Sequence, residues 1–550
     1  MELIDQHTKK IMEGCKERAR DAGLKFQDET LEYIVTNRDL LELSPKIMIP
    51  TLYDYWVHDV EVLKEKGKYE LYPGNPYETV INTRPAISFY NDNNPDWLNV
   101  MIFYHVLAHI DFFQNNIFYR HTWDYDFTGQ ALSDKRLIAK LRSEHGRWVD
   151  YVIEFSRGID NLAGYYYELS GLNSKENAGW SKRIDFYFDV FIQEINKLSV
   201  HEYIKEIERY NECMKESGDL GEDTFMAEID LKHPEFKELF RKSREEKPKS
   251  KPDLIQYLME HSEFLNKEKN KWMNSVLQVV RNTSIFFQPQ IRTKIMNEGW
   301  ASYWHETLFM KDDRIGGHEV DFARLNAGVT SMPRVGLNPY ALGMRLFYYI
   351  EEMADKGMLS FEFQKVANAE ERKIFDRDTK NGRSFIFSVR ENYSDFMFIN
   401  KFLDQDFATR NRLFVAGRRL NRAKKVYEYY IKSRKLEDYR GMVLDSLYHP
   451  PQIEIDTEKM KDNSLYLTHT FENKPLVKEF ISNTMVGIEY LWGAPVHLET
   501  HEVVGARSVP SQDLTLLGPT PTGDETAAPE IKWQKVLYSM KNKKLTRKIL

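Results

Sequence analysis

The sequence has little cysteine: Cys15 and Cys213 are the only two in 550 residues. Their number and spacing exclude a disulfide framework or a cysteine-ligated metal, and they suit a reducing compartment. No run of about 18 apolar residues is long enough to cross a bilayer. The first residues also lack the basic stretch and apolar run of a signal peptide. We therefore expect a cytoplasmic protein without an integral membrane segment.

The chain also lacks an excess of positive charge: its net charge is −7 and its isoelectric point is near 6.2. Affinity for nucleic acids comes largely from neutralising phosphates with Lys and Arg. The overall charge therefore argues against a general nucleic-acid binder, although it leaves local basic patches open. We expect no nucleic-acid partner on this basis.

The apolar pattern predicts a mainly α-helical chain that ends in a small α+β unit. A length of 550 residues suggests roughly three or four folding units. Strand-like alternation appears only at 453–455, 465–469 and 496–500, around a helix at 475–492. Further helices are expected at 52–66, at 97–119, within 178–216, from near Pro289, and from Asn338-Pro339 to about residue 355. The predicted domains are a helical region 1–245, a second helical region 253–445 after a charged linker at 247–252, the α+β unit 446–502, and a disordered tail 503–550.

Two segments contain the side chains of a metal site. His105 and His109 are spaced i and i+4 on the predicted buried helix 97–119, so both imidazoles lie on one face. Glu298 supplies a carboxylate far along the chain, and two His with one carboxylate are a common ligand set for zinc or non-haem iron. We predict that His105, His109 and Glu298 bind a divalent metal, with zinc first and iron second.

Three further residues are candidates for catalytic roles. His305 lies two helical turns beyond Glu298, about 10.5 Å along the axis, so we predict an acid, a stabiliser of negative charge, or a donor to a ligand. Asp111 follows His109 by two residues, about 200° around the helix, and is a candidate base or orienting residue. His318, in a loop with two glycines, is a secondary candidate for a residue that approaches the site.

A structural role for the same residues is the alternative. Histidines on an aromatic helix are often hydrogen-bonded core residues, and the cluster of Trp300, Tyr303 and Trp304 is typical of packing. Zinc hydrolases often carry H-E-x-x-H, in which the Glu is the general base. This sequence has Val106 at that position, so a base must come from elsewhere.

Four segments together carry a family resemblance. They are His105-Val106-x-x-His109-x-Asp111-Phe112-Phe113-x-Asn115-Asn116; Gln288-Pro289-Gln290-x-x-Thr293-Lys294-Ile295-Met296-Asn297-Glu298-Gly299-Trp300-Ala301; Leu337-Asn338-Pro339-Tyr340-x-Leu342-Gly343; and Leu465-Tyr466-Leu467-x-His469 with Leu491-Trp492-Gly493-x-Pro495-Val496-His497-Leu498-Glu499-Thr500. They resemble the stage V sporulation protein R (SpoVR) family from about residue 30 to 500. The resemblance implies a bacterial cytoplasmic protein linked to spore cortex formation or to stress physiology, with protein partners from those processes.

The segment around Glu298 also resembles the third-ligand helix of some helical zinc peptidases. That resemblance implies a zincin-like helical core and gives Tyr303 a role in stabilising developing charge. Three functions stay open: a metal-dependent hydrolase of amide bonds, for example in peptidoglycan peptides; a non-catalytic regulatory or scaffold protein; and a non-haem Fe(II) enzyme. The hydrolase ranks first.

Overall fold

The computed structural model describes residues 2–27, 29–36, 39, 78–122, 127–163, 182–195, 206, 209–210, 212–214, 221–245, 253–366, 368–421, 426–447, 451, 453–471, 475–503 and 533–550. These residues form two compact units, Met1–Tyr165 with Leu254–Leu550, and Tyr166–Asp253. The predicted helix at 52–66 and the linker at 247–252 lie outside the described residues.

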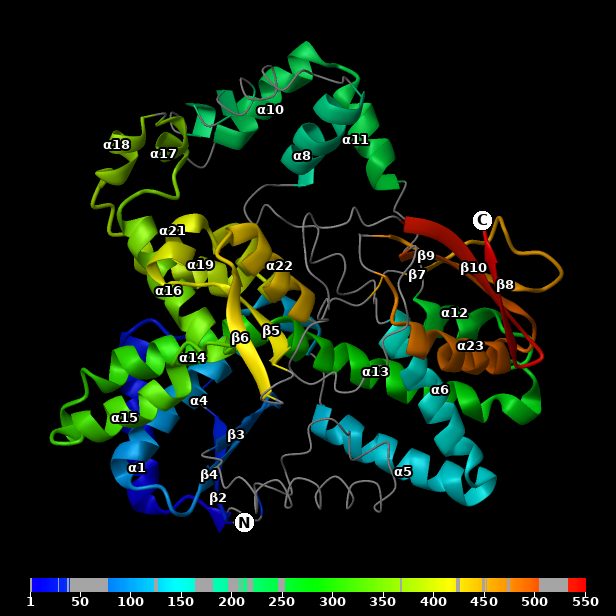
Figure 1. The fold of residues 1–550 in the computed structure, drawn as a ribbon, viewed down its shortest axis with the longest axis horizontal. Helices are drawn as coiled ribbons and strands as arrows, with labels where there is room; N and C mark the ends of the chain where they lie inside the picture. The colour runs from blue at the N-terminus through cyan, green and yellow to red at the C-terminus, as the bar shows by residue number, and fades with distance from the viewer. Residues whose placement is uncertain are drawn as a thin grey trace. The chain divides into compact units, whose positions relative to one another are not determined.

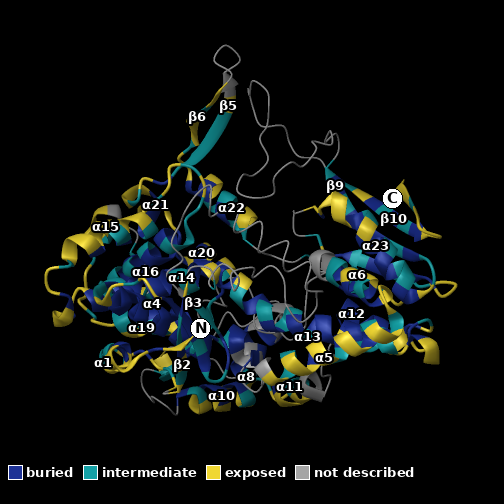
Figure 2. Cartoon of the chain, turned by 90° about the horizontal axis from the view of Figure 1, so that it is seen from below, coloured by how far each residue is buried: buried dark blue, intermediate teal, exposed yellow. Residues whose placement is uncertain are grey.

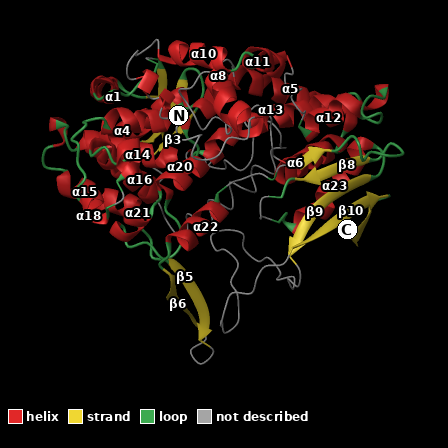
Figure 3. Cartoon of the chain, turned by 90° about the horizontal axis from the view of Figure 1, so that it is seen from above, coloured by secondary structure: helices red, strands yellow, loops and turns green. Residues whose placement is uncertain are grey.

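Helices dominate the larger unit, as the apolar pattern predicts (Figures 1 and 3). They are α1 (Gln6–Asp21), α4 (Asp96–Asn115), α5 (Phe127–His145), α6 (Trp148–Ala163), α12 (Leu254–His261), α13 (Trp272–Arg292), α14 (Lys294–Phe309), α15 (Glu319–Thr330), α16 (Pro339–Asp355), α17 (Phe361–Lys365), α18 (Ala369–Lys373), α19 (Gly382–Asn392), α20 (Asp395–Phe402), α21 (Gln405–Arg410), α22 (Leu436–Ser446) and α23 (Lys478–Trp492), with short 3-10 turns η1 (Ile117–Thr122), η4 (Glu268–Asn270) and η5 (Asp313–Ile315).

A small mixed sheet precedes α4. Its strands β1 (Glu2–Leu3), β2 (Thr30–Val35), β4 (Ala86–Asn91) and β3 (Glu78–Ile81) lie in that order, and only β2 and β4 run parallel. Helix α4 then begins after Pro95 and has no Gly or Pro to interrupt it. Every residue of α4 from 98 to 114 is buried, so its polar side chains must find partners within the protein (Figure 2).

Helix α14 packs against both α4 and α16. Gly299 of α14 faces Gly343 of α16: a Cβ on Gly299 would lie 2.7 Å from the backbone nitrogen of Met344. The absence of a side chain at both positions allows this close approach of the two helices. The prediction that a helix begins near Pro289 is wrong, because Pro289 lies inside α13 and α14 begins only at Lys294.

The C-terminal α+β unit has the predicted order of strand, strand, helix and strand. Its sheet runs β11 (Lys544–Ile549), β10 (Trp533–Lys541), β9 (Val496–Val503), β8 (Leu465–His469), β7 (Ile453–Ile455), and β8 pairs with β9 in parallel, with α23 between them in sequence. This sheet shares one buried apolar cluster with α6, α12, α13 and α23. The smaller compact unit ends at Asp253, next to the predicted linker, whereas no boundary of the compact units falls at 445, because helices from both predicted helical regions complete this core.

The predicted disorder of 503–550 is wrong for its last 18 residues, which form β10 and β11. Alternate residues of β10, Val536, Tyr538 and Met540, are buried, and Lys535 pairs with Glu499. The many Lys and Arg residues of this segment hide the alternation in the sequence. Residues 504–532, which contain the Pro- and Thr-rich stretch, lie outside the described residues.

The smaller unit has its own aromatic core. Its described elements are α8 (Lys182–Asp185), a π-helix η2 (Phe186–Ile195), α10 (Gly221–Lys232) and α11 (Phe236–Glu245), packed around a cluster of Phe and Tyr side chains. The helices predicted within 178–216 are described only in part. Among all the described residues of the chain, none belongs to a helix long and apolar enough to span a membrane.

Candidate metal centre

Helix α4 places His105 and His109 side by side, as their i, i+4 spacing predicts. Their ring centroids are 4.6 Å apart, and the two residues are only 7% and 5% exposed. Glu298 reaches the same place from α14: its Oε2 lies 3.6 Å from His109 Nε2 and 3.9 Å from His105 Nε2. One ligand atom from each of the three lies within 4.8 Å of the others.

Asp395 fixes the start of the helix that carries Glu298. Its two carboxylate oxygens accept hydrogen bonds from the backbone amides of Ile295 and Met296, each at 2.8 Å. These amides belong to the first turn of α14, where they have no partner within the helix. Burial raises the pKa of Asp395 to about 7. This cap comes from α20, a hundred residues later, and the sequence analysis missed it.

Asn297 fixes the orientation of the His109 ring. The Oδ1 of Asn297 lies 2.9 Å from His109 Nδ1. A carbonyl oxygen only accepts, so His109 donates Nδ1–H to it. In a ring with a single proton, Nε2, the nitrogen nearest Glu298, is then the unprotonated one.

A longer chain of hydrogen bonds fixes His105. Asn326 of α15 donates Nδ2–H to the carboxylate of Glu306 at 2.8 Å, which leaves its Oδ1 as the acceptor for His305 Nε2 at 3.0 Å. His305 therefore carries its proton on Nε2 and accepts at Nδ1 from His105 Nδ1, 2.9 Å away. His105 is left with an unprotonated Nε2, which points at Glu298.

Burial keeps these rings neutral. It lowers the pKa of His105 well below the usual value, and the nearby His109 and His305 lower it further. Burial likewise lowers the pKa of His305 to about 4. A metal ligand must be a neutral imidazole with a lone pair, and its other nitrogen usually donates a hydrogen bond that orients the ring. Both ligand histidines meet these conditions.

The three ligand atoms suit a single divalent ion. An ion bound tetrahedrally at about 2.1 Å holds its ligands roughly 3.4 Å apart, close to the two separations between Glu298 and the histidines. Two imidazoles and one carboxylate are ligands that zinc and non-haem iron both accept. The residues present therefore fit the predicted metal.

The structure does not bring Asp111 to this group. Its carboxylate accepts from the Lys25 amide at 2.7 Å and from Trp300 Nε1 at 2.9 Å, and it pairs with Arg390 at 3.3 Å. The helical angle between Asp111 and His109 turns the carboxylate to another face of α4. A role as base or as a partner of the ligand histidines loses its basis, and Asp111 instead joins α4 to α14 and α19.

Tyr303 also lies elsewhere. Its hydroxyl donates to Glu351 of α16, and the guanidinium of Arg383 lies 5.4 Å from its ring centroid. His318 is partly exposed and stacks on Trp97 with ring centroids 5.7 Å apart, so it is not part of the ligand group either. Of the predicted catalytic residues, only His305 contacts a predicted ligand.

Tyr340 is an aromatic neighbour that the sequence analysis did not select. It is the first residue after Pro339 in α16, and its ring lies parallel to that of His105, with centroids 6.2 Å apart and planes at 17°. Val106, at the position of the zinc-peptidase base, is fully buried. Tyr340, Asn297 and Asn326 could have been found only by knowing which helices meet.

A buried helix pair with two imidazoles, one carboxylate and oriented rings defines a helical protein with a candidate metal centre. The family model described as SpoVR like protein matches residues 3–449, and the chain belongs to this family. All residues of the candidate centre lie inside this match. A similar curated protein, "Uncharacterized protein YcgB" of Escherichia coli (strain K12), is 22% identical over 497 residues, which cover 86% of this chain and 88% of its own length. No solved structure matches the chain. The zincin-like core remains a prediction.

Proposed function

We propose that this chain is a metal-dependent hydrolase of amide bonds that holds zinc through His105 Nε2, His109 Nε2 and Glu298. The observation that carries the proposal is the hydrogen bonding of the two imidazoles. Each uses Nδ1 for a protein partner and presents Nε2 to the same carboxylate oxygen. Histidines with a purely structural role have no need to converge in this way. Peptides of the cell wall are the substrate class that family membership suggests.

When bound, zinc supplies a Lewis acid that polarises a carbonyl and lowers the pKa of water to about 7. The protein's own contribution is to hold the ligands neutral and oriented in a buried site. Asn297 and His305 orient the two rings, and we assign to Tyr340 the stabilising role that the sequence analysis gave to Tyr303. Because Val106 offers no base, the reaction depends on this preorganisation more than it does in an H-E-x-x-H peptidase.

Metal content of the full chain, purified without added metal, tests the proposal. We expect about one equivalent of zinc per chain and a loss to background in His105→Ala and Glu298→Ala. His318→Ala is the matched control, because it removes a partly exposed histidine outside the site, and it should keep the metal. Circular dichroism separates loss of ligand from loss of fold.

The other outcomes decide between the alternatives. Iron in place of zinc would replace the hydrolase with a non-haem Fe(II) enzyme, for which Val106 is no obstacle because that chemistry needs no base beside the ligand. No bound metal in the wild type, with binding also absent after zinc or iron is added, would overturn both catalytic proposals. The regulatory or scaffold function would then be the better account.

The hydrogen-bond chain behind His105 makes a second prediction. Asn326→Leu removes the acceptor for His305 Nε2–H and frees His305 to change tautomer, so His105 Nε2 is no longer kept unprotonated. We expect zinc affinity to fall by about 10- to 100-fold, as measured by competition with a chelator. Asn282→Leu makes the same change on α13, where Asn282 accepts from Gln278, and should leave the affinity unchanged. Equal affinities for the two variants would contradict this orienting role.

A further inference from the structure

The hairpin of β5 (Val415–Asn421) and β6 (Val426–Ser433) has a charge opposite to that of the chain. Residues 411–435 contain nine Lys or Arg and one acidic residue, Glu428, a local net charge of +8 in a chain whose net charge is −7. The rest of the protein is therefore strongly acidic. A concentration of positive charge in 25 consecutive residues requires a local explanation.

One face of this hairpin combines aromatic and cationic side chains. Directly paired residues share a face, and Arg418 pairs with Tyr429 and Ala416 with Ile431. Tyr427 lies on the same face because it is two residues from Tyr429. Arg418, Tyr427, Tyr429 and Ile431 make up what we call the tyrosine face.

The rings of the tyrosine face are open to solvent. Tyr427 is 58% exposed and Tyr429 53% exposed, and the Arg418 guanidinium lies 5.2 Å from the Tyr427 ring centroid. On the opposite face Arg419 pairs with Glu428 at 3.3 Å, and Tyr430 covers Gly417. Figures 2 and 3 show the ribbon extending away from α21 and α22. Exposed aromatics on both faces of a two-stranded ribbon mark a surface that has a partner.

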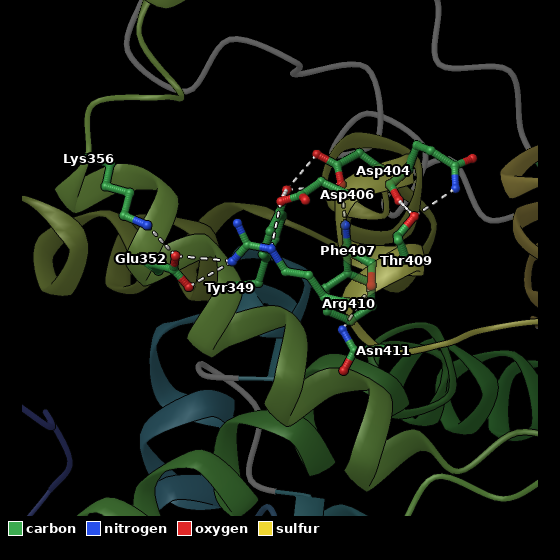
Figure 4. A network of polar contacts seen from close by, with 10 residues as sticks. Tyr349, Glu352, Lys356, Asp404, Asp406, Phe407, Thr409, Arg410 and Asn411 are labelled. Atoms are coloured by element: carbon green, nitrogen blue, oxygen red, sulfur yellow. Dashed lines mark hydrogen bonds and ion pairs between the residues drawn. The ribbon is translucent and has the colours of Figure 1, made fainter. Parts of the chain in front are cut away.

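A polar network holds the base of the ribbon in place (Figure 4). Arg410, at the end of α21, pairs with Glu352 of α16 at 3.1 Å and with Asp406 at 2.8 Å. Tyr349 donates to Asp404, the N-cap of α21, at 2.8 Å. Strand β5 therefore begins five residues after Arg410, the last residue of a helix that is tied to α16. These contacts fix the position of the base of the ribbon.

We propose that the tyrosine face binds single-stranded nucleic acid. Two rings on one face of a strand are about 6.8 Å apart along it, a spacing that lets successive unstacked bases each stack on a ring. Aromatic rings in a positive surface are the recurring design of proteins that bind single strands without sequence preference. The surrounding Arg and Lys side chains would hold the phosphates. The overall negative charge confines this binding to the ribbon.

An anionic membrane is the less favoured partner. Three cationic residues, Arg422, Lys424 and Lys425, fall between the two strands in sequence, and the apolar side chains belong to the strands. Inserting those side chains into hydrocarbon would carry several charges with them. Bases and phosphates, by contrast, match the two kinds of side chain where they are.

The test uses the full chain and fluorescein-labelled 12-nucleotide RNA and DNA strands in fluorescence anisotropy at low salt. Binding should weaken by about 10-fold or more when Tyr427→Ala and Tyr429→Ala are combined, since each stacked base is lost. The double Tyr→Phe variant keeps both rings and should keep binding, which separates loss of stacking from loss of the hairpin. Tyr151→Ala removes a tyrosine that is 51% exposed on α6 and should have no effect.

Salt dependence adds an independent readout. Arg418→Gln should reduce the slope of log affinity against log salt by about 0.7, the value for one phosphate contact on a single strand. No binding of either strand at low salt, or an equal loss in Tyr151→Ala, would overturn the proposal. Binding only to phosphatidylserine vesicles, with the same dependence on Tyr427 and Tyr429, would replace nucleic acid with a membrane surface.

Discussion

Arg390→Met is expected to lower the free energy of unfolding by about 3–5 kcal/mol, because it leaves the buried Asp111 carboxyl without its ion-pair partner. Both residues are fully buried, and Arg390 Nε lies 3.3 Å from Asp111 Oδ2. The Arg390 guanidinium also lies 5.7 Å from the ring centroid of Trp300, which donates to the same carboxylate. The pair therefore ties α4, α14 and α19 together beside the metal helices. Urea unfolding followed by tryptophan fluorescence measures the change.

Arg383→Met is the matched control for this prediction. Arg383 lies on the same helix, pairs with Glu351 at 3.0 Å and also lies over an aromatic ring, that of Trp304. Its side chain is 40% exposed, and the Glu351 carboxylate keeps the hydrogen bond that Tyr303 donates. The expected loss is at most about 1 kcal/mol. Similar losses of stability in the two variants would mean that the burial of the ion pair does not determine the effect of removing its arginine.

The candidate metal ligands could be selected from the sequence because their signals are local. The i, i+4 spacing of His105 and His109 places both rings on one face of any helix, and an apolar sequence around them fixes that helix as buried. Glu298 was selected as the third candidate ligand from a motif in a second segment of the chain. Strands β8 and β9 were equally predictable, since period-2 alternation at 465–469 and 496–500 can be recognised without knowledge of the rest of the chain.

The orienting residues were not predictable, because tertiary packing alone brings them together. His305 was expected two turns from Glu298, and that spacing holds, but its contact with His105 depends on how α14 crosses α4. Asn326 lies on a third helix with no motif around it. Asp111 and Tyr303 show the reverse case. Closeness in sequence to His109 suggested a role for Asp111, and the zinc-peptidase resemblance suggested one for Tyr303, whereas their helical positions turn them toward Arg390 and Glu351.

Gly343→Ala is expected to destabilise the protein by about 3 kcal/mol and to abolish zinc binding in the same variant. A Cβ on Gly343 would clash with the carbonyl oxygen of Ile295 and lie 2.7 Å from Cα of Gly299. Both are backbone atoms of α14, so no side-chain rotation relieves the overlap and the two helices must separate. Because Glu298 is adjacent to Gly299, that separation moves the carboxylate relative to the two histidines on α4.

Gly328→Ala distinguishes this clash from a general effect of adding a methyl group to a helix. Gly328 lies inside α15, and a Cβ there meets nothing within 4 Å. Alanine is the better helix former, so this variant should gain about 0.5–1 kcal/mol and keep its zinc. The two readouts also separate the causes. Gly343→Ala with reduced stability but unchanged zinc affinity would mean that α14 and α4 move together. Loss of zinc binding in Gly343→Ala without loss of stability would mean that the close contact between α14 and α16 is needed only for the metal centre.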